Sequence, residues 1–281
     1  MAGKNVFKEL EERVKVLEKT VAEKQLIIDK LRREIGNKKD DRELRKYHNN
    51  NKNAKMATML ALAKLAEFRD DDTGRHLERI REYTKIIAEE MAKKPNYIGY
   101  ITKEYIEDIY HSCILHDIGK VGIPDAILLK PGRLTPDEFE LIKTHTTLGG
   151  DVITAVEAEI EGRTFLTLAK EIAYYHHERW DGSGYPKGLS GENIPLSARI
   201  VALPDVYDAL TSERIYKKII SHEKARETII REKGKHFDPE VVDSFLARED
   251  DFKMICENLH NRNFERGMEK YKIGLFVLNK N

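Results

Sequence analysis

The sequence feature that most constrains the fold is a dispersed set of metal-ligand side chains centred on Leu115–Lys120, which reads Leu-His-Asp-Ile-Gly-Lys. His116 and Asp117 supply a nitrogen and an oxygen ligand, and adjacent residues of an α-helix point about 100° apart. A carboxylate between two cations would be shared by both, while the imidazole would hold one of them. A single pair of this kind proves nothing, so its weight depends on the residues that accompany it.

The accompanying residues lie on both sides of the pair, far apart in the sequence. They are His76, His145, the doublet His176-His177 and Asp205. Lys120 follows Asp117 by three residues and His116 by four, so on a helix it shares their face and adds a positive charge. A phosphate bound between metals and a lysine is the simplest ligand for that arrangement. The fold must therefore bring several distant segments to one site.

Composition excludes several classes of protein. The 281 residues suffice for one large domain with an appendage or for two small domains. Lysine plus arginine and aspartate plus glutamate are both 49, so no global field attracts bulk nucleic acid or an anionic membrane. No apolar run approaches the roughly 18 residues of a membrane span, and the first residues lack a signal-peptide core. We therefore expect a cytoplasmic protein whose two cysteines are reduced thiols.

Residues 1–36 carry a heptad repeat. Phe7, Val14, Val21, Ile28 and Ile35 recur every seven residues, and Leu10, Leu17 and Leu31 fill the intermediate positions, with Lys24 as the polar interruption. Mostly β-branched residues at the first position and leucine at the second favour a parallel two-stranded coiled coil. We predict a dimerisation or signalling helix over 1–36, followed by a charged linker over 37–52. An amphipathic helix lying on the main domain of the same chain is the alternative.

Residues 53–250 are predicted to form one all-α domain, because helical periodicity recurs throughout and no alternating strand pattern is present. Helix starts are signalled by the capping box at Thr135–Glu138, with proline at the first helical position, and by Asp238-Pro239. In such a domain, the metal ligands must project from several helices toward a shared interior site. Residues 251–281 are predicted to be a C-terminal extension, to which the sequence assigns no function.

Several candidate ligands also have purely structural explanations. Asp72 and His76 are four residues apart and would share a helix face, but the acidic run around Asp72 also suits the first turn of a helix. A lone histidine on an apolar face is more often a packed core residue, and this applies to His76. His145 is expected near the end of the helix that starts at Thr135, where the macrodipole favours a cation. The other histidines favour the metal interpretation.

The histidine doublet ends an apolar helix and leads into the glycine-rich stretch Asp181–Pro186. A loop of this kind lets the backbone approach a bound ligand closely, although glycine-rich stretches are usually only loops. Asp205 follows Pro204, which removes one backbone donor and is expected to bend or loosen the helix at that point. Arg214 and Lys217 form a cationic pair suited to phosphate, and solvation of a helix end is their alternative role.

Together these stretches resemble the HD-GYP family, a branch of the HD-domain metal-dependent phosphohydrolases. The matching stretches are His116–Lys120, His176–Pro186, Asp205–Arg214 and Gly234–Pro239, within about Leu60–Leu246. The resemblance implies an HD-domain helical bundle that hydrolyses cyclic dinucleotides, chiefly cyclic di-GMP, to linear pGpG and in some members onward to GMP. It also implies two or three divalent metal ions, for which iron or manganese suits the histidine and carboxylate ligands.

The resemblance assigns roles to individual residues. The metal ligands would be Asp72, His76, His116, Asp117, His145, His176, His177 and Asp205, with Asp117 bridging two ions. Asp72 stands where some members carry glutamate as a ligand of a third metal, and it is shorter by one methylene. Asp117 and Lys120 would be catalytic, and Lys120, Tyr185, Arg214 and Lys217 would bind substrate. Pro204 and Ile215 depart from the family pattern, and Pro204 bears directly on where Asp205 points.

The sequence leaves alternatives open for the function itself. The leading hypothesis is a dimeric cyclic-dinucleotide phosphodiesterase. A second is an HD phosphohydrolase that acts on another nucleotide, against which the loop containing Tyr185 argues. A third is a non-catalytic module that senses a cyclic dinucleotide or docks on a diguanylate cyclase through Gly182–Pro186. The presence of every ligand type argues against a degenerate site.

Overall fold

The computed structural model describes residues 19–20, 23–28, 38–67, 75–160, 162, 164–212 and 220–257. The chain divides into two compact units, residues 1–57 and 58–281. In the first unit, residues 19–20 and 23–28 are helical, and Leu26, Ile27 and Ile28 are exposed. The remaining heptad residues lie outside the described part of the chain, so the coiled coil stays a prediction. The stretch predicted as a linker is helical from Lys38 onward, within α2 (Lys38–Glu67).

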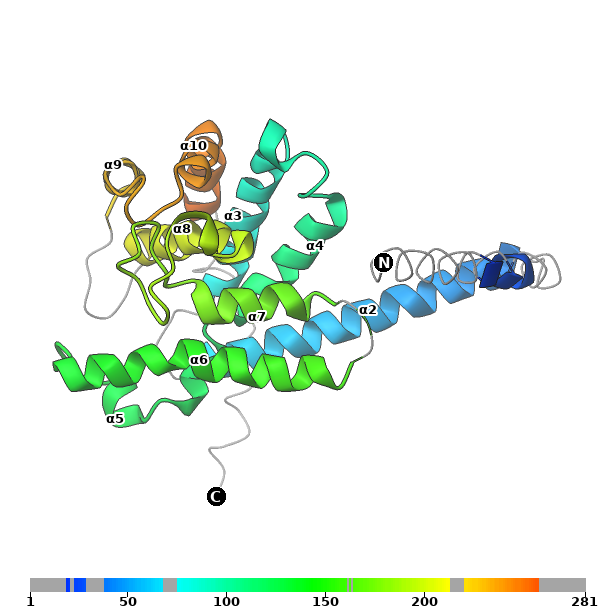
Figure 1. The fold of residues 1–281 in the computed structure, drawn as a ribbon, viewed down its shortest axis with the longest axis horizontal. Coiled ribbons are helices and arrows are strands. Elements are labelled where there is room, and N and C mark those ends of the chain that lie inside the picture. The colour runs from blue at the N-terminus through cyan, green and yellow to red at the C-terminus, as the bar shows by residue number, and fades with distance from the viewer. Residues whose placement is uncertain are drawn as a thin grey trace, which may run out of the picture. The chain divides into compact units, whose positions relative to one another are not determined.

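The second unit is built from helices (Figure 1). After α2 come α3 (His76–Met91), η2 (Pro95–Tyr97), α4 (Lys103–Ser112), η3 (Cys113–Leu115), η4 (Ile118–Gly122), α5 (Asp125–Leu128), α6 (Pro136–Ala158), α7 (Leu166–Tyr175), η5 (Gly191–Asn193), α8 (Leu196–Thr211), α9 (His222–Arg231) and α10 (Pro239–Ala247). The described residues contain no strand, only an isolated bridge between Lys233 and Phe237. The predicted all-α class is confirmed. No helix in the described ranges has the length and apolar character needed to cross a membrane.

The predicted capping box at the start of α6 is present. The Thr135 side chain accepts the backbone N–H of Glu138 at 3.3 Å, and the Glu138 carboxylate accepts the backbone N–H of Thr135 at 2.7 Å. The helix runs on to Ala158, well past the glycines at 149 and 150. His145 therefore lies in the middle of α6, and its predicted place near the helix end was wrong.

The two glycines are tolerated inside α6 because other segments press against them. A Cβ on Gly150 would lie 2.4 Å from the ring of Tyr174 on α7, so only glycine lets the two helices approach this closely. On η4, a Cβ on Gly119 would lie 1.9 Å from the carbonyl oxygen of His145 and 2.5 Å from the backbone nitrogen of Gly149. Helix α6 thus packs along α7 (Figure 1) and also against η4.

An aromatic cluster joins α3, α8 and α10 on the other side of the domain. Tyr83 of α3 stacks on Phe252 with ring centroids 4.4 Å apart, and Tyr207 of α8 and Phe245 of α10 contact the same phenylalanine ring. Phe252 is fully buried, and burying such a side chain contributes roughly 1.5–3 kcal/mol. Residues 251–257 are helical and complete this core, although the sequence assigned them to the C-terminal extension.

Candidate metal centre

The central His-Asp pair lies in a tight turn between two short 3-10 helices, where an α-helix was expected. His116 closes η3 with a backbone N–H bond to the Cys113 carbonyl at 3.2 Å, and Asp117 precedes η4. The i,i+3 geometry of this turn still puts Lys120 on the same face as Asp117, because their Nζ and Oδ2 atoms lie 2.8 Å apart. The predicted neighbourhood of these two side chains is therefore present, by a different backbone route.

The first group of potential ligands gathers around one oxygen of Asp117. Asp117, His145, His176 and His177 each offer one ligand atom, and these atoms all lie within 4.8 Å of one another. Asp117 Oδ1 lies 3.2 Å from Nε2 of His145 and 3.6 Å from Nε2 of His176. His145 comes from the middle of α6, and the doublet follows the last turn of α7. The contact between α6 and α7 is what brings these residues together.

The second group of potential ligands adjoins the first. His76, His116 and Asp205 each offer an atom within 4.8 Å of the others. The Nε2 atoms of His76 and His116 are 3.4 Å apart, and Asp205 Oδ1 lies 3.8 Å from each of them. His76 is the first residue of α3, and Asp205 lies on α8. Helix α8 continues through Pro204, and this proline does not turn Asp205 away from the group.

Asp117 faces both groups. Its Oδ1 points toward His145 and His176, whereas its Oδ2 lies 3.3 Å from Nε2 of His116. Burial opposes ionisation of this carboxyl, but Lys120 and His116 outweigh burial and hold its pKa well below its usual range. Asp117 is thus a carboxylate with one oxygen directed to each group, as a bridging ligand requires.

The histidines present lone pairs to the interior. In His116, His145 and His176, Nδ1 lies 2.6–2.9 Å from a backbone carbonyl oxygen. A carbonyl oxygen only accepts, so Nδ1 carries a proton, and Nε2 is the nitrogen that offers its lone pair to a cation once any proton on it has been displaced. Fixing the outer nitrogen in this way is a common means of orienting metal-bound histidines.

The residues fit divalent cations. Asp117 Oδ1, His145 Nε2 and His176 Nε2 are buried and make no hydrogen bond, a costly arrangement unless a further group satisfies them. Burial and the neighbouring His176 lower the pKa of His177 well below its usual range, so that ring is neutral and able to coordinate. Burial opposes protonation of His116, but Asp117 and Asp205 still raise its pKa to about 9. The interior therefore attracts positive charge, and cation uptake displaces protons.

Sequence reasoning missed two residues that hold His76 in place. Its Nδ1 lies 2.7 Å from Oδ2 of Asp208, and Arg79 donates two hydrogen bonds to the same carboxylate at 2.5 and 2.9 Å. Burial opposes ionisation of Asp208, but Arg79 and His76 bring its pKa down to about 2. The spacing gave a signal, since Asp208 is one turn after Asp205 and Arg79 is one turn after His76.

Replacing Asp208 by asparagine is expected to weaken cation binding by about 10–100-fold. The amide keeps an oxygen for Arg79 but gives up the charge that fixes the His76 tautomer. Calorimetric titration of chelator-treated protein with Mn²⁺ measures the change. The control is Asp243→Asn on α10, which removes a half-exposed carboxylate paired with Lys233 and should leave the affinity unaltered. Equal affinities in Asp208→Asn and wild type would contradict the orienting role.

The glycine-rich loop is folded around a buried carboxylate. Glu178, which precedes the loop, accepts the backbone N–H groups of Lys187 at 2.7 Å and Leu189 at 3.0 Å, so the segment that leaves the loop is tied back to its start. This closure sets the ring of Tyr185 4.8 Å from that of His177, at the edge of the first group. Lys143 of α6 lies 5.6 Å above the Tyr185 ring and adds positive charge there.

The Gly234–Pro239 stretch, which the sequence matched without a role, supports the same loop. The backbone N–H groups of Trp180 and Asp181 donate to the carbonyls of His236 and Lys235 at 3.1 and 2.8 Å. Asp238 caps α10 and binds Arg199 at 2.7 Å. The motif therefore acts through the loop and not through the metal ligands.

Three predicted site residues lie outside the described ranges, namely Asp72, Arg214 and Lys217. The departure at Ile215 lies there as well. Their predicted roles in metal and phosphate binding stay predictions.

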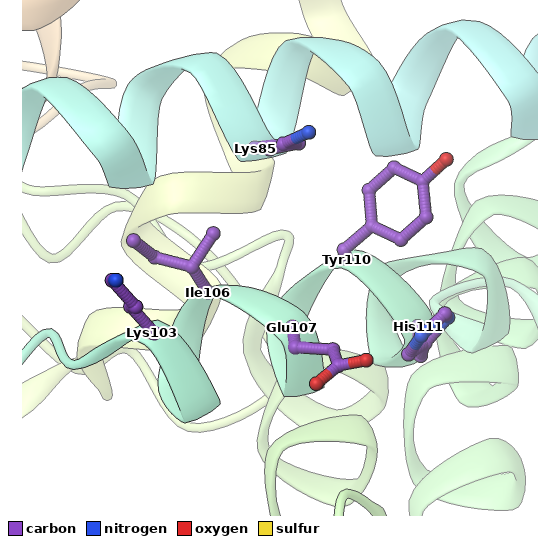
Figure 2. Close-up of a pocket in the computed structure, with 6 residues that line it drawn as sticks. All are labelled: Lys85, Lys103, Ile106, Glu107, Tyr110 and His111. Atoms are coloured by element: carbon purple, nitrogen blue, oxygen red, sulfur yellow. The ribbon is translucent and has the colours of Figure 1, made fainter. Parts of the chain in front are cut away.

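A surface pocket of about 480 Å³ lies between α3 and α4 (Figure 2). Its lining comprises Lys85, Lys103, Ile106, Glu107, Tyr110 and His111. It includes none of the residues of the two ligand groups.

Comparison with known proteins agrees with the ligand pattern. A family model described as the HD domain matches residues 61–241. A cyclic di-GMP phosphodiesterase of Vibrio cholerae is 50% identical over 205 residues, covering 73% of this chain and 42% of the relative. One from Thermotoga maritima is 46% identical over 185 residues, covering 66% and 47%. A 3'3'-cGAMP-specific phosphodiesterase 2 of Vibrio cholerae is 38% identical over 198 residues, covering 70% and 35%. The chain spans less than half the length of these relatives.

Among solved structures, a crystal structure of a cyclic GMP-AMP specific phosphodiesterase from Vibrio cholerae is similar, with a TM-score of 0.51. The sequence identity is 20%, and the match covers 73% of this chain and 53% of that chain. At this identity the likeness concerns the fold alone.

Proposed function

The chain belongs to the HD-domain family, and from that premise we propose that it is a metal-dependent phosphodiesterase that hydrolyses cyclic di-GMP. The observation that carries the proposal is the sharing of Asp117 between two adjacent ligand groups. Relatives named cyclic di-GMP phosphodiesterases, at 46–50% identity, support the choice of substrate.

The proposed reaction follows from the residues around the shared carboxylate. Two divalent cations, when bound, supply an activated water and neutralise charge on the phosphoryl oxygens. Asp117 positions both sides of the site, and Lys120 adds a positive charge beside the scissile phosphate. Water attacks phosphorus, the bond from phosphorus to the 3′ oxygen breaks, and that oxygen leaves with a proton. The product of the first cleavage is linear pGpG, and a second cleavage would give GMP.

Iron or manganese is the proposed metal, because neutral imidazoles and carboxylates suit either ion. The two described groups account for two cations. A third depends on Asp72, outside the described ranges. Metal analysis of protein purified without oxygen exposure tests the number, and fewer than two ions per chain would contradict the proposed enzyme.

The substrate is tested by incubating metal-loaded protein with cyclic di-GMP, 3'3'-cGAMP and nucleoside monophosphates. We expect cyclic di-GMP to be consumed and pGpG to appear, and chromatography measures both. Turnover of the monophosphates alone would favour a different HD phosphohydrolase. Tight binding of cyclic di-GMP without turnover by a fully loaded protein would instead favour a sensor, or a docking module for a diguanylate cyclase.

We also propose that residues 1–36 pair two chains in a parallel coiled coil. The exposed side chain of Ile28, which occupies a first heptad position, supports this, since the same position of a second copy would cover its apolar surface. Deleting residues 1–36 is expected to convert a dimer into a monomer in sedimentation while hydrolysis per chain persists. A truncated protein that still sediments as a dimer would show that the dimer interface lies outside residues 1–36. The cytoplasmic location expected from the sequence remains a prediction.

A further inference from the structure

Glu67, the last residue of α2, lies beside the second ligand group. Its Oε1 is 3.6 Å from Nε2 of His76, and its side chain is only 12% exposed. The same nitrogen lies 3.4 Å from His116 Nε2 and 3.8 Å from Asp205 Oδ1. Because the Nδ1–H of His76 donates to Asp208, Nε2 is the nitrogen left for a cation, and it faces the Glu67 carboxylate as well as the other two residues. Glu67 therefore brings a carboxylate oxygen close to the same nitrogen that faces the second ligand group.

These separations match those of ligands around one cation. Ligand atoms held about 2.1 Å from a tetrahedral ion lie about 3.4 Å apart. The distances from Nε2 of His76 are 3.4 Å to His116 Nε2, 3.6 Å to Glu67 Oε1 and 3.8 Å to Asp205 Oδ1. Glu67 meets the group at His76 and lies outside the set whose atoms are all within 4.8 Å of one another. A small turn of its flexible side chain, or one intervening water, completes the contact.

We propose that Glu67 is an additional carboxylate ligand of the cation held by His76, His116 and Asp205. This inference rests on the proposed metal-dependent function. The second group contains a single carboxylate, Asp205, beside two imidazoles, with Asp117 shared with the first group. A further negative charge lowers the free energy of a divalent cation there, and it makes the end of α2 part of the centre. The sequence predicted Asp72 as the extra acidic ligand, five residues farther along.

The test is titration of the chelator-treated full chain with Mn²⁺, followed by calorimetry and by electron paramagnetic resonance. Wild type is expected to bind two ions and to give the exchange-coupled signal of a pair. Glu67→Gln should weaken the second ion about 10–100-fold, keep the first, and lose the coupled signal at limiting Mn²⁺. Glu67→Asp, which retains a carboxylate one methylene shorter, should fall between the two.

The matched control is Glu78→Gln. Glu78 lies on α3, is bonded to Lys64 at 2.5 Å and is partly buried, so the same change there should leave both affinities unaltered. Thermal unfolding of the metal-free proteins separates a ligand from a structural residue, since Glu67→Gln should unfold near wild type. Equal weakening of both ions, or a loss found in Asp72→Asn and absent from Glu67→Gln, would overturn the proposal. A wild type that binds no Mn²⁺ would refute the proposed function itself.

Discussion

Replacing Asp117 by alanine is expected to lower cyclic di-GMP hydrolysis by about 10³-fold or more, while the helical fold persists. Removing one donor from a preorganised transition-state site costs roughly 10²–10³-fold, and this carboxylate serves two ligand groups and Lys120 together. The fold should persist because Asp117 contributes no apolar side chain to the hydrophobic core, and its Oδ2 contacts are with Lys120 and His116 of the same site. Product formation at saturating substrate and metal content per chain are the measurements.

The control is Asp243→Ala, which removes a half-exposed carboxylate from α10. It should turn over cyclic di-GMP like wild type. Circular dichroism on both variants verifies that helix content is maintained. Full activity in Asp117→Ala, or loss of activity with both cations still bound as tightly as in wild type, would remove the bridging role.

Gly119→Ala is expected to destabilise the domain by more than about 3 kcal/mol, the upper end of overpacking costs. The new methyl carbon would lie 1.9 Å from the His145 carbonyl oxygen and 2.5 Å from the Gly149 nitrogen, and both atoms are backbone. Neither can move away without shifting α6. In a domain of this size such a loss lowers the unfolding temperature by roughly 6–12 °C. If η4 shifts to relieve this steric clash, Asp117 moves away from His145, so activity should also fall by about 10²-fold.

Gly122→Ala supplies the matched control on the same short helix. Its Cβ would meet only Leu148, at 2.8 Å from Cδ1, and that side chain is partly exposed and free to turn. We expect a change below about 1 kcal/mol, comparable with ordinary surface substitutions. Differential scanning calorimetry of the two variants makes the comparison. Similar unfolding temperatures for both would show that the contact of η4 with α6 is not tight.

The sequence predicted the fold class and the seven His and Asp residues that form the two groups, because ligand types and helix signals are local. The capping box at Thr135 is encoded within four residues, and it is present in α6. Asp205 shows the limit of such reasoning. Pro204 suggested a helix bent away from the site, yet the buried packing of α8 keeps the helix continuous and Asp205 in the second group.

Other features depend on contacts between distant segments. His145 was expected near a helix end, but α6 continues through the two glycines that follow it, where η4 and Tyr174 press on the helix. The roles of Arg79 and Asp208 required the pairing of α3 with α8, which no local pattern specifies. Phe252 joined the core for the same reason, since its partners Tyr83 and Tyr207 are far away in the chain.

The carboxylate of Glu178 fixes the conformation of the loop beside the metal centre before any ligand binds. Because the main chain is anchored at Lys187 and Leu189, the Tyr185 ring would lose little further conformational freedom on contact with a bound nucleotide. Immobilising a mobile side chain would otherwise cost about 0.5–1.5 kcal/mol on association. If Tyr185 binds the substrate as proposed, the loop would therefore select a nucleotide base by its fixed shape.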